Sequence, residues 1–333
     1  MHQTAPPLVT IIIPYGPGYS YSMVLDSIKQ LDYPLDRIEV IAVEGKQPAH
    51  QRNEALAAAN GEFVFFFDDD VTLDKNIIRR MLRFYEDHEV TIVGGPNLTP
   101  PSDSFIQQCF GYVMGSSFVT GKTSQRWKPS GTAREATEND LILCNMSGRT
   151  SVLKENLFDE RLWPGEEIDF LVRLRKQGFK AIYDPESIVY HSRRTTVGKF
   201  SKQIFGYACG RAEALMIHPA AFEAIYLVPS LFVLYLLSLP LAVTISSFSR
   251  SLGLLYCAPL LLYIGVDLLA SLRTAIQNRH LLAAVVLPLL FPLAHVSYGL
   301  GLLRSFLFRT IHRKELSLHV RMQRVALTQE RTR

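Results

Sequence analysis

The first 200 residues alternate between short apolar runs and segments with helical spacing. Residues 9–13, 38–43 and 61–67 are rich in β-branched and aromatic side chains, which is typical of buried strands. Between them, apolar side chains recur at helical spacing in residues 22–31 and 52–59. This order predicts a βαβαβ arrangement, and therefore an α/β, Rossmann-like domain with a mostly parallel sheet. In such a sheet, ligands bind at the carboxyl ends of the strands.

The third apolar run ends in three consecutive carboxylates, Asp68, Asp69 and Asp70. Adjacent carboxylates repel one another unless a cation or strong hydrogen-bond donors neutralise them. Their position at a predicted strand end therefore favours a ligand or cation site. The alternative is a solvated loop, because Asp is common in turns and caps and the helical pattern of residues 76–85 follows closely.

A second acidic cluster, Glu166, Glu167 and Asp169, stands at the start of a predicted amphipathic helix. Acidic residues in a first helical turn complement the helix dipole, which is the structural alternative. The functional alternative is that the two acidic clusters have different roles: the first binds a cation that neutralises charge, and the second accepts a proton. His191, at the end of a predicted strand in residues 188–191, can complete a metal site begun by carboxylates.

The last third of the chain is much more apolar than the rest. Residues 224–246 carry no charge, residues 251–272 carry only Asp267, and residues 281–303 carry only His295 as a titratable group. A run of about 20 apolar residues can cross a bilayer core. The hydropathy pattern therefore predicts three candidate membrane segments.

The distribution of charge predicts on which side of a membrane the two ends of the chain lie. Residues 304–333 contain eight Arg or Lys against two Glu, which predicts a cytoplasmic tail near anionic lipid rather than one that binds nucleic acid. The N-terminus lacks the pattern of a signal peptide, so the first 200 residues are expected in the cytoplasm. A cytoplasmic head and tail need an even number of crossings. Either the middle segment with Asp267 is re-entrant or lies partly in protein, or one of the other segments rests at the interface.

The first two thirds of the chain contain a series of short motifs. In order they are Val9-Thr10-Ile11-Ile12-Ile13-Pro14, Tyr33-Pro34, Arg52-Asn53 with Ala59-Asn60-Gly61-Glu62, Asp68-Asp69-Asp70, Phe158-Asp159-Glu160, Gly165-Glu166-Glu167-Ile168-Asp169-Phe170 and Tyr190-His191. In their order and spacing these motifs resemble glycosyltransferase family 2, the GT-A-fold enzymes that use nucleotide-diphosphate sugars, with Asp68-Asp69-Asp70 in the place of D-x-D and Gly165–Phe170 in the place of E-D-x-D. The resemblance covers roughly residues 8–210.

The resemblance implies a role for each matching residue. A nucleotide-sugar donor would be bound by Pro14, Tyr15, Gly16, Glu44, Arg52, Asp68 and Asp69. A divalent cation, Mg²⁺ or Mn²⁺, would be held by Asp70, Asp68 and His191. The catalytic group would be Glu167 as general base, less favourably Glu166, with Asp169 beside them. The acceptor side would be lined by Asn145, Ser147, Arg149 and Trp163.

Departures from the family pattern narrow the class. Glu44-Gly45 stands where the family usually has Asp-Asp-Gly-Ser, which leaves the nucleotide base open. Glu167 replaces the usual Asp and reaches one methylene further. The chain has no Q-x-x-R-W motif of processive members, so transfer of one sugar per encounter is expected.

The sequence thus predicts a GT-A catalytic domain in residues 1–197, an amphipathic interfacial segment in 198–222, a membrane region with up to three helices in 223–304, and a basic cytoplasmic tail in 305–333. For residues 198–222, an ordinary amphipathic helix packed on the catalytic domain is the alternative. The four cysteines lie far apart and indicate neither a disulfide framework nor a zinc site.

The expected function is inverting transfer of one sugar to a hydroxyl of a lipid-linked saccharide, by a multi-pass protein at the cytoplasmic membrane face. A tethered site suggests a lipid acceptor, because a soluble acceptor gives no reason for a membrane anchor. The alternatives are a polyprenyl-phosphate glycosyl synthase, whose ionised lipid phosphate needs no base, and a membrane assembly protein that has lost the chemistry. A carrier built on Asp267 and His295 is disfavoured because the segments show no repeat.

Overall fold

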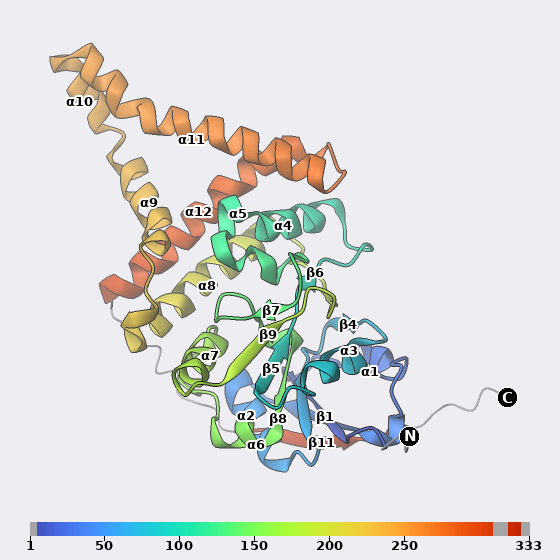
Figure 1. Ribbon diagram of the computed structural model, residues 1–333. Coiled ribbons are helices and arrows are strands. Elements are labelled where there is room, and N and C mark those ends of the chain that lie inside the picture. The colour runs from blue at the N-terminus through green and yellow to red at the C-terminus, as the bar shows by residue number, and fades with distance from the viewer. Residues whose placement is uncertain (1–4, 309–318, 328–333) are drawn as a thin grey trace. The chain divides into compact units, whose positions relative to one another are not determined.

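The computed structural model describes residues 5–308 and 319–327 (Figure 1). Within these residues the chain forms two compact units. The first unit comprises residues up to 102, residues 125–192 and the described part of the C-terminal segment, and the second comprises residues 103–124 and 193–308. Most of the predicted α/β domain falls in the first unit, and the predicted apolar helices lie in the second.

The first unit is built on an eight-stranded sheet with the order β11-β2-β1-β3-β8-β5-β9-β7. Its strands are β1 (Val9–Tyr15), β2 (Ile38–Glu44), β3 (Phe63–Phe66), β5 (Val90–Gly94), β7 (Arg134–Glu135), β8 (Met146–Arg149), β9 (Lys180–Tyr183) and β11 (Arg321–Val325). Its helices are α1 (Ser22–Ile28), α2 (Pro48–Ala58), α3 (Ile77–Phe84), α6 (Thr150–Glu155) and α7 (Glu166–Lys176).

The three predicted strands pair in parallel as expected, with β1 between β2 and β3. The strand β1 is apolar on both faces because helices cover both sides of the sheet. Ile11 and Ile13 belong to one core, and Ile12 belongs to the other. The sheet as a whole is mixed rather than mostly parallel, since β8 inserts antiparallel between β3 and β5.

A second, three-stranded sheet lies beside the end of β3. It consists of β4 (Val71–Leu73), β10 (Val189–His191) and β6 (Asn97–Leu98), in the order β4-β10-β6. The antiparallel register pairs His191 with Val71, the residue after the acidic triplet. The fold therefore brings together two segments that are about 120 positions apart in the sequence.

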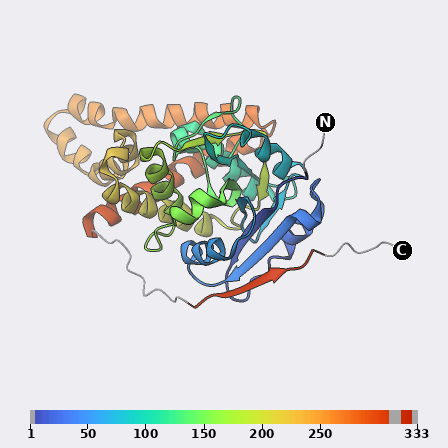
Figure 2. The same cartoon turned by 60° about the horizontal axis from the view of Figure 1, so that its bottom comes forward.

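The C-terminal segment contains a strand, β11, that the basic composition of this segment did not predict. Residues 305–333 were expected to form only a basic tail, but β11 adds to the edge of the sheet by pairing antiparallel with β2 (Figure 2). In β11, Met322 and Val325 pack against the cores of the first unit, while Arg324 forms an ion pair with Glu39 at 3.2 Å. Residues 309–318 and 328–333 of the tail lie outside the described residues.

The second unit consists of helices. They are α4 (Phe105–Gly115), α5 (Ser117–Thr120), α8 (Val197–Ile217), α9 (Val228–Ser238), α10 (Leu241–Phe248), α11 (Arg250–Gln277) and α12 (Ala283–Phe308). Residues 103–124, which include α4 and α5, had been assigned to the catalytic domain, but they pack with the apolar helices. The physical reason is the apolar side of α4, which contacts α12 within this unit.

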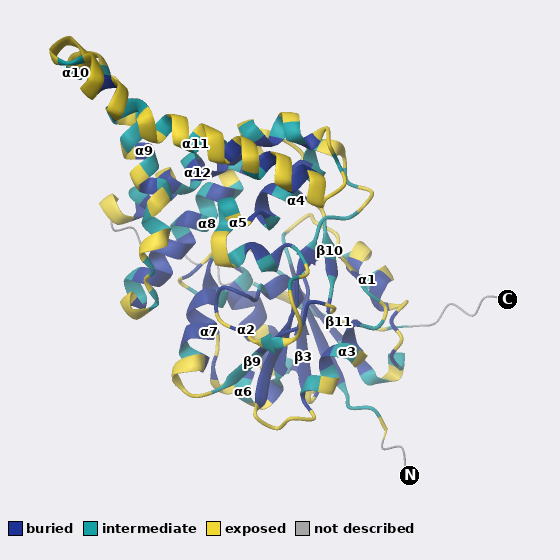
Figure 3. Cartoon of the chain, turned by 45° about the horizontal axis from the view of Figure 1, so that its top comes forward, coloured by how far each residue is buried: buried dark blue, intermediate teal, exposed yellow. Residues whose placement is uncertain are grey.

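Two helices, α11 and α12, are long and apolar enough to cross a membrane. The shorter helices of residues 224–248 also pass this test when taken together, but they are bent by 60° at a break. Many large apolar residues of α10 and α11 are exposed, and much of the ribbon of these helices is accordingly coloured yellow (Figure 3). Exposed apolar surface of this extent is typical of helices that face lipid or a protein partner.

The helix α8 occupies most of the predicted interfacial segment 198–222. Its buried face packs against α12, where Ala208, Ala212 and Leu302 form a small core. The two helices approach so closely at Gly301 that a Cβ atom there would lie 2.5 Å from the Phe205 carbonyl oxygen. The amphipathic pattern of α8 thus reflects, at least on this face, contact with an apolar helix of the same unit.

Candidate active site

The acidic triplet lies directly beyond the buried end of β3. Phe67 is fully buried, Asp68 and Asp69 are partly buried, and Asp70 is exposed. Burial, together with the charges of Asp70 and Asp68, raises the pKa of Asp69 to about 6. The triplet therefore lies at the edge of the sheet where parallel strands present ligand sites, as predicted.

His191 joins this cluster from β10. Its Nε2 atom lies 2.9 Å from Asp70 Oδ1, and its Nδ1 atom lies 3.3 Å from Asn97 Nδ2. Burial alone would lower the pKa of His191, but hydrogen bonds to Asp70 and Cys144 and their charges raise it to about 10. The raised pKa of His191 favours the imidazolium form, whose charge opposes that of the nearby carboxylates.

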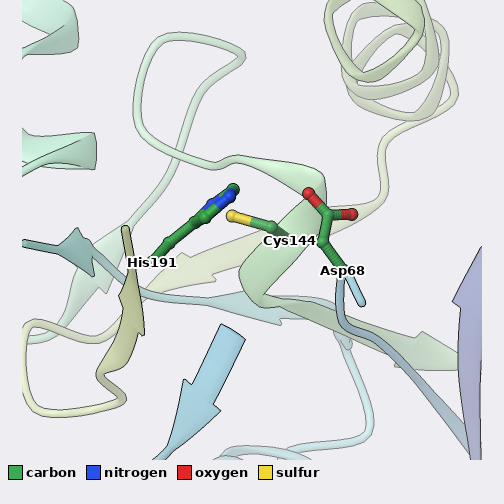
Figure 4. A group of neighbouring side chains, drawn as sticks. All are labelled: Asp68, Cys144 and His191. Carbon is green, nitrogen blue, oxygen red and sulfur yellow. The ribbon is translucent and has the colours of Figure 1, made fainter. Parts of the chain in front are cut away.

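Three side chains in this cluster have the composition of a metal site. One ligand atom from each of Asp68, Cys144 and His191 lies within 4.8 Å of the others. Figure 4 shows the carboxylate, the sulfur and the imidazole ring directed toward one another. Carboxylate, thiolate and imidazole are all ligands of divalent metal ions, so these residues fit a divalent cation.

Arg52 connects the acidic triplet to the second acidic cluster. Its guanidinium donates from Nη2 to Asp68 Oδ1 at 3.1 Å and from Nη1 to Glu166 Oε1 at 2.9 Å. The Arg52 side chain is only 5% exposed. The helix α2 positions it at the end of the sheet, and a buried, charge-assisted double contact of this kind is geometrically specific. The two carboxylate clusters are therefore parts of one site.

Glu166 and Glu167 differ in their surroundings although they are adjacent in α7. Glu166 is buried, pairs with Arg52 and also accepts a hydrogen bond from the Gly165 amide at 3.0 Å. Burial raises the pKa of Glu166, and the Arg52 guanidinium opposes this effect. Glu167 is less buried, and its Oε1 atom accepts from Arg126 Nη1 at 3.2 Å. Glu167 thus keeps more contact with solvent.

Arg126 is a functional candidate that the sequence interpretation missed. It is 6% exposed, and its guanidinium donates to the backbone carbonyls of Asn139, at 3.1 Å, and of Glu138 as well as to Glu167. A basic residue about 40 positions before its partner carries no periodic signal. The sequence interpretation also missed Cys144 and Asn97, because only folding brings these two residues close to His191.

Asp169 does not share the surroundings of the two glutamates. It is 2% exposed, and its carboxylate accepts a hydrogen bond from Arg173 Nε at 2.9 Å, one helical turn along α7. Arg173 in turn donates to the carbonyl of Leu157. These contacts stabilise the start of α7, and the expected place of Asp169 in the catalytic group stays a prediction.

The expected nucleotide side lies at the ends of β1 and β2. Pro14 is buried, Tyr15 pairs with Glu44 across these parallel strands, and Gly16 begins the turn that follows. Burial, with the charge of Glu44 next, raises the pKa of Tyr15. The Tyr15 ring packs against Tyr21 at 5.0 Å. The predicted donor residues of these two strands are therefore neighbours in space.

The residues predicted for the acceptor side have several different environments. Because β8 runs antiparallel to β3, Arg149 pairs with Phe63 at the far end of that strand and donates to the Val90 and Tyr85 carbonyls. Ser147 is fully buried and bonds to the Tyr85 hydroxyl at 2.8 Å. Neither lies at the carboxylate edge, so their assignment to the acceptor side was wrong.

The other two acceptor-side candidates behave differently. Asn145 is buried, and its amide donates to the carbonyls of Pro96 and Ser187, at 2.9 and 2.7 Å. It therefore fixes the backbone beside Cys144. Trp163 is 44% exposed and precedes Glu166 by three positions, and its place on the acceptor side stays a prediction.

The profile of a family described as glycosyltransferase like family 2 matches residues 5–210 of the chain, which is more than half of its length. The chain belongs to this family. It is accordingly a glycosyltransferase, and the α/β sheet with its carboxylate edge is the GT-A domain that the family resemblance predicted.

Individual relatives agree with this assignment. A dolichyl N-acetyl-α-D-glucosaminyl phosphate 3-β-D-2,3-diacetamido-2,3-dideoxy-β-D-glucuronosyltransferase of Methanococcus voltae is 26% identical over 291 residues, which cover 85% of this chain and 84% of that protein. A pre-mycofactocin glycosyltransferase of Mycobacterium tuberculosis is 28% identical over 174 residues. That match covers 52% of this chain and only 36% of the relative.

A solved structure shows the same fold. A mannosyltransferase from Pyrobaculum calidifontis, determined in complex with GDP-mannose and Mn²⁺, superposes with a TM-score of 0.53. The match covers 91% of this chain and 88% of that one at 17% sequence identity. At this identity the likeness establishes the GT-A fold of the family member described here and not its substrates.

Proposed function

We propose that this glycosyltransferase moves one sugar from a nucleoside-diphosphate sugar to a hydroxyl of a lipid-linked saccharide, with inversion at the anomeric carbon. The observation that carries the proposal is Arg52, which joins Asp68 of the donor cluster to Glu166 of the α7 cluster. A group suited to a charged leaving group and a group suited to proton transfer are thereby held in one site.

The donor side binds and neutralises the diphosphate. Asp68, Asp70 and His191 would hold a divalent cation, Mg²⁺ or Mn²⁺, which stabilises negative charge on the departing nucleoside diphosphate. Tyr15 and Glu44, at the ends of β1 and β2, are placed to contact the nucleotide. Arg52 fixes the orientation of Asp68 and limits the repulsion within the triplet.

The proton acceptor is Glu167. Its carboxylate is held by one guanidinium contact to Arg126 and remains partly exposed, whereas Glu166 is buried and paired on both of its oxygens. A general base must reach the acceptor hydroxyl, so the more open carboxylate is the better candidate. Direct attack of a hydroxyl deprotonated by Glu167 on the face opposite the leaving group gives inversion.

The acceptor is proposed from the apolar helices and from one relative. The helices α11 and α12 are long enough to cross a membrane, and the printed name of the Methanococcus voltae relative specifies a dolichyl phosphate-linked sugar. We therefore place the reaction at a membrane, with a polyprenyl-linked saccharide as acceptor. The protein would be multi-pass, with its catalytic domain on the cytoplasmic side.

The test uses membranes that contain the full-length protein. Release of nucleoside diphosphate is measured with UDP-, GDP- and dTDP-sugars, with and without Mg²⁺ or Mn²⁺, and each assay is repeated with Asp70→Asn. We expect one donor to be used, and its use to require both the cation and Asp70. Use of that donor by Asp70→Asn at an unchanged rate would contradict the proposed donor site.

A second variant, Glu167→Gln, separates two kinds of acceptor. A hydroxyl acceptor needs a base, and removal of a general base typically costs about 10²- to 10⁴-fold in rate. A lipid phosphate is already ionised and would react at nearly the normal rate. Retained turnover in Glu167→Gln would therefore support a polyprenyl-phosphate glycosyl synthase instead.

A further inference from the structure

The cluster at the carboxylate edge contains a cysteine that the family resemblance does not explain. Cys144 lies in a short 3₁₀ helix, Leu143–Asn145, just before β8, whereas Asp68 follows β3 and His191 ends β10. Three separate elements thus contribute one side chain each. Their ligand atoms lie within 4.8 Å of one another, and Figure 4 shows all three directed toward a common point.

The surroundings hold the Cys144 sulfur in this position. The side chain is 2% exposed, and Sγ accepts a hydrogen bond from Asn97 Nδ2 at 3.1 Å. The next residue, Asn145, is anchored through its amide to the carbonyls of Pro96 and Ser187. A buried cysteine that merely filled space would behave as a small apolar side chain. Here the sulfur faces an imidazole and a carboxylate.

This donor set is not the one that Mg²⁺ prefers. Mg²⁺ takes oxygen ligands in near-ideal octahedral geometry and usually keeps several waters. Thiolate and imidazole ligands favour first-row transition metals, whose affinity for such ligands rises from Mn²⁺ through Co²⁺. A site with one sulfur and one nitrogen among its protein ligands therefore discriminates against Mg²⁺.

We propose that Cys144 is a ligand of the cation at this site, together with Asp68 and His191, and that it makes the enzyme selective for a transition-metal ion over Mg²⁺. Binding forms a bond between the metal and sulfur, and the thiol proton is released to solvent. Asn97 is a positioning residue for the sulfur. The inference rests on the proposed function only in that the same cation would assist departure of the nucleoside diphosphate.

The test measures metal binding to the full-length protein in detergent, after bound metal has been removed with a chelator. Co²⁺ is the probe, because a Co²⁺–thiolate bond produces a charge-transfer absorption in the near ultraviolet. We expect wild type to show this absorption at one equivalent of Co²⁺, and Cys144→Ser to lose it. Loss of one ligand should weaken Co²⁺ and Mn²⁺ binding about 10- to 100-fold, as loss of outer-shell support does at other sites, while Mg²⁺ binding changes little.

The matched control is Cys109→Ser. Cys109 is equally buried but belongs to α4 in the second unit, so this variant should keep both the absorption and the metal affinity. A second measurement needs no substitution: X-ray absorption of the Zn²⁺-loaded wild type should show one sulfur at about 2.3 Å. It decides the question if Cys144→Ser does not fold.

Three outcomes would overturn the inference. They are a Co²⁺ complex without thiolate absorption, a Zn²⁺ site without sulfur, and a ratio of Mn²⁺ to Mg²⁺ affinity that Cys144→Ser leaves unchanged. These outcomes are independent of the donor assay. Sugar transfer supported equally by Mg²⁺ and by a sulfur-free Mn²⁺ site would refute the role of Cys144 and leave the proposed function standing.

Discussion

Arg52 is the residue through which the two carboxylate clusters meet, so its replacement tests their connection directly. Arg52→Lys keeps the positive charge but cannot contact Asp68 and Glu166 simultaneously with a planar fork. We expect the transfer rate to fall at least about 10²-fold, the loss typical of a misplaced reacting group, with the protein still folded. The measurement is kcat/KM for the donor identified in the panel, together with the melting temperature.

The control for Arg52→Lys is Arg161→Lys. Arg161 also pairs with a carboxylate, Asp159, but its side chain is 63% exposed, and exposed pairs contribute little. That variant should keep both rate and stability. An Arg52→Lys enzyme that transfers sugar as fast as wild type would mean that the two clusters work without this link.

Glu39 allows a prediction of pH dependence. Burial would raise the pKa of Glu39, but hydrogen bonds from the Thr10 hydroxyl and from the Asn60 amide and side chain, with the Arg324 charge, lower it. A group whose pKa falls on folding stabilises the native state above its unfolded pKa, near 4.5, and this contribution is lost as the pH drops through the folded pKa. Glu39→Gln should therefore cost about 1–2 kcal/mol at neutral pH.

The readout is the melting temperature of wild type and Glu39→Gln between about pH 7 and pH 3, a range that spans the unfolded carboxyl pKa. The two curves should converge at acid pH, because protonated Glu39 resembles Gln. The exposed residue Glu54 provides the control, since Glu54→Gln should follow the wild-type curve. A constant difference between Glu39→Gln and wild type at every pH would contradict the assigned cause.

The residue scale also shows what the sequence could indicate about the site. Asp68 and Glu167 were identifiable because each lies at the boundary of a periodic element, Asp68 after β3 and Glu167 at the start of α7. Arg126 and Cys144 were not, because they lie in segments without periodicity and reach the site only through tertiary packing. Arg149 was misplaced because the direction of β8 cannot be deduced from four residues, and that direction decides which end of the strand faces the ligand.

At the scale of elements, the small sheet β4-β10-β6 sets the position of His191 and Asn97, and its geometry depends on Gly95. A Cβ atom at Gly95 would lie 2.0 Å from the carbonyl oxygen of Ser187 and 2.6 Å from that of Asp184. Since both neighbours are backbone atoms, Gly95→Ala must displace β6 or the turn before β10. We expect Gly95→Ala to lower the melting temperature and to weaken Mn²⁺ binding.

The control for Gly95→Ala is Gly206→Ala. A Cβ atom at Gly206, within α8, meets nothing within 4 Å, and Ala is the better helix former by about 1 kcal/mol. That variant should be unchanged or slightly more stable. Isothermal titration of Mn²⁺ into Gly95→Ala and Gly206→Ala distinguishes a local effect on the metal site from a general loss of stability. Equal Mn²⁺ affinities of the two variants would show that the geometry of the small sheet does not depend on Gly95.

Some elements can be predicted from the sequence much more readily than others. The runs that became β1, β2 and β3 are short, β-branched and bounded by turn residues, so both their type and their parallel pairing followed. The strand β11 gave no such signal. Polar and apolar side chains alternate only weakly over its five residues, Arg321–Val325, which lie within a basic tail. These residues form a strand because the edge of β2 is available for pairing.

At the scale of the whole molecule, the number of membrane crossings follows from where the chain returns to the catalytic side. Three apolar segments are available: the bent pair α9–α10, α11 and α12. Beyond α12, β11 pairs with β2, so the chain after the last apolar helix lies on the same side as the catalytic sheet. The number of crossings between β2 and β11 must therefore be even.

The start of α12 is held against α4. The His280 ring, just before α12, stacks on Phe105 with centroids 5.0 Å apart, and Phe105 follows β6 by only a few residues. We predict from these two connections that both ends of α12 lie on one side of the membrane, so that α12, although long enough to cross, would not do so. The crossing hairpin would then consist of α9–α10 and α11, which are linked by a hydrogen bond from the Tyr235 hydroxyl to the Tyr256 carbonyl at 2.9 Å.

This arrangement predicts the accessibility of two turns. A cysteine at Ser247, near the hairpin tip, should react with a membrane-impermeant maleimide only from the side opposite the catalytic domain. A cysteine at Asn278, between α11 and α12, should react only from the catalytic side, as should one at the exposed Glu54. Labelling is compared in sealed vesicles of both orientations, and mass spectrometry identifies the modified peptide.

The positions of Arg273 and Arg279 agree with this orientation, since basic residues concentrate on the cytoplasmic side. Labelling of Ser247→Cys and Asn278→Cys from the same side would instead make α12 one of the crossing helices.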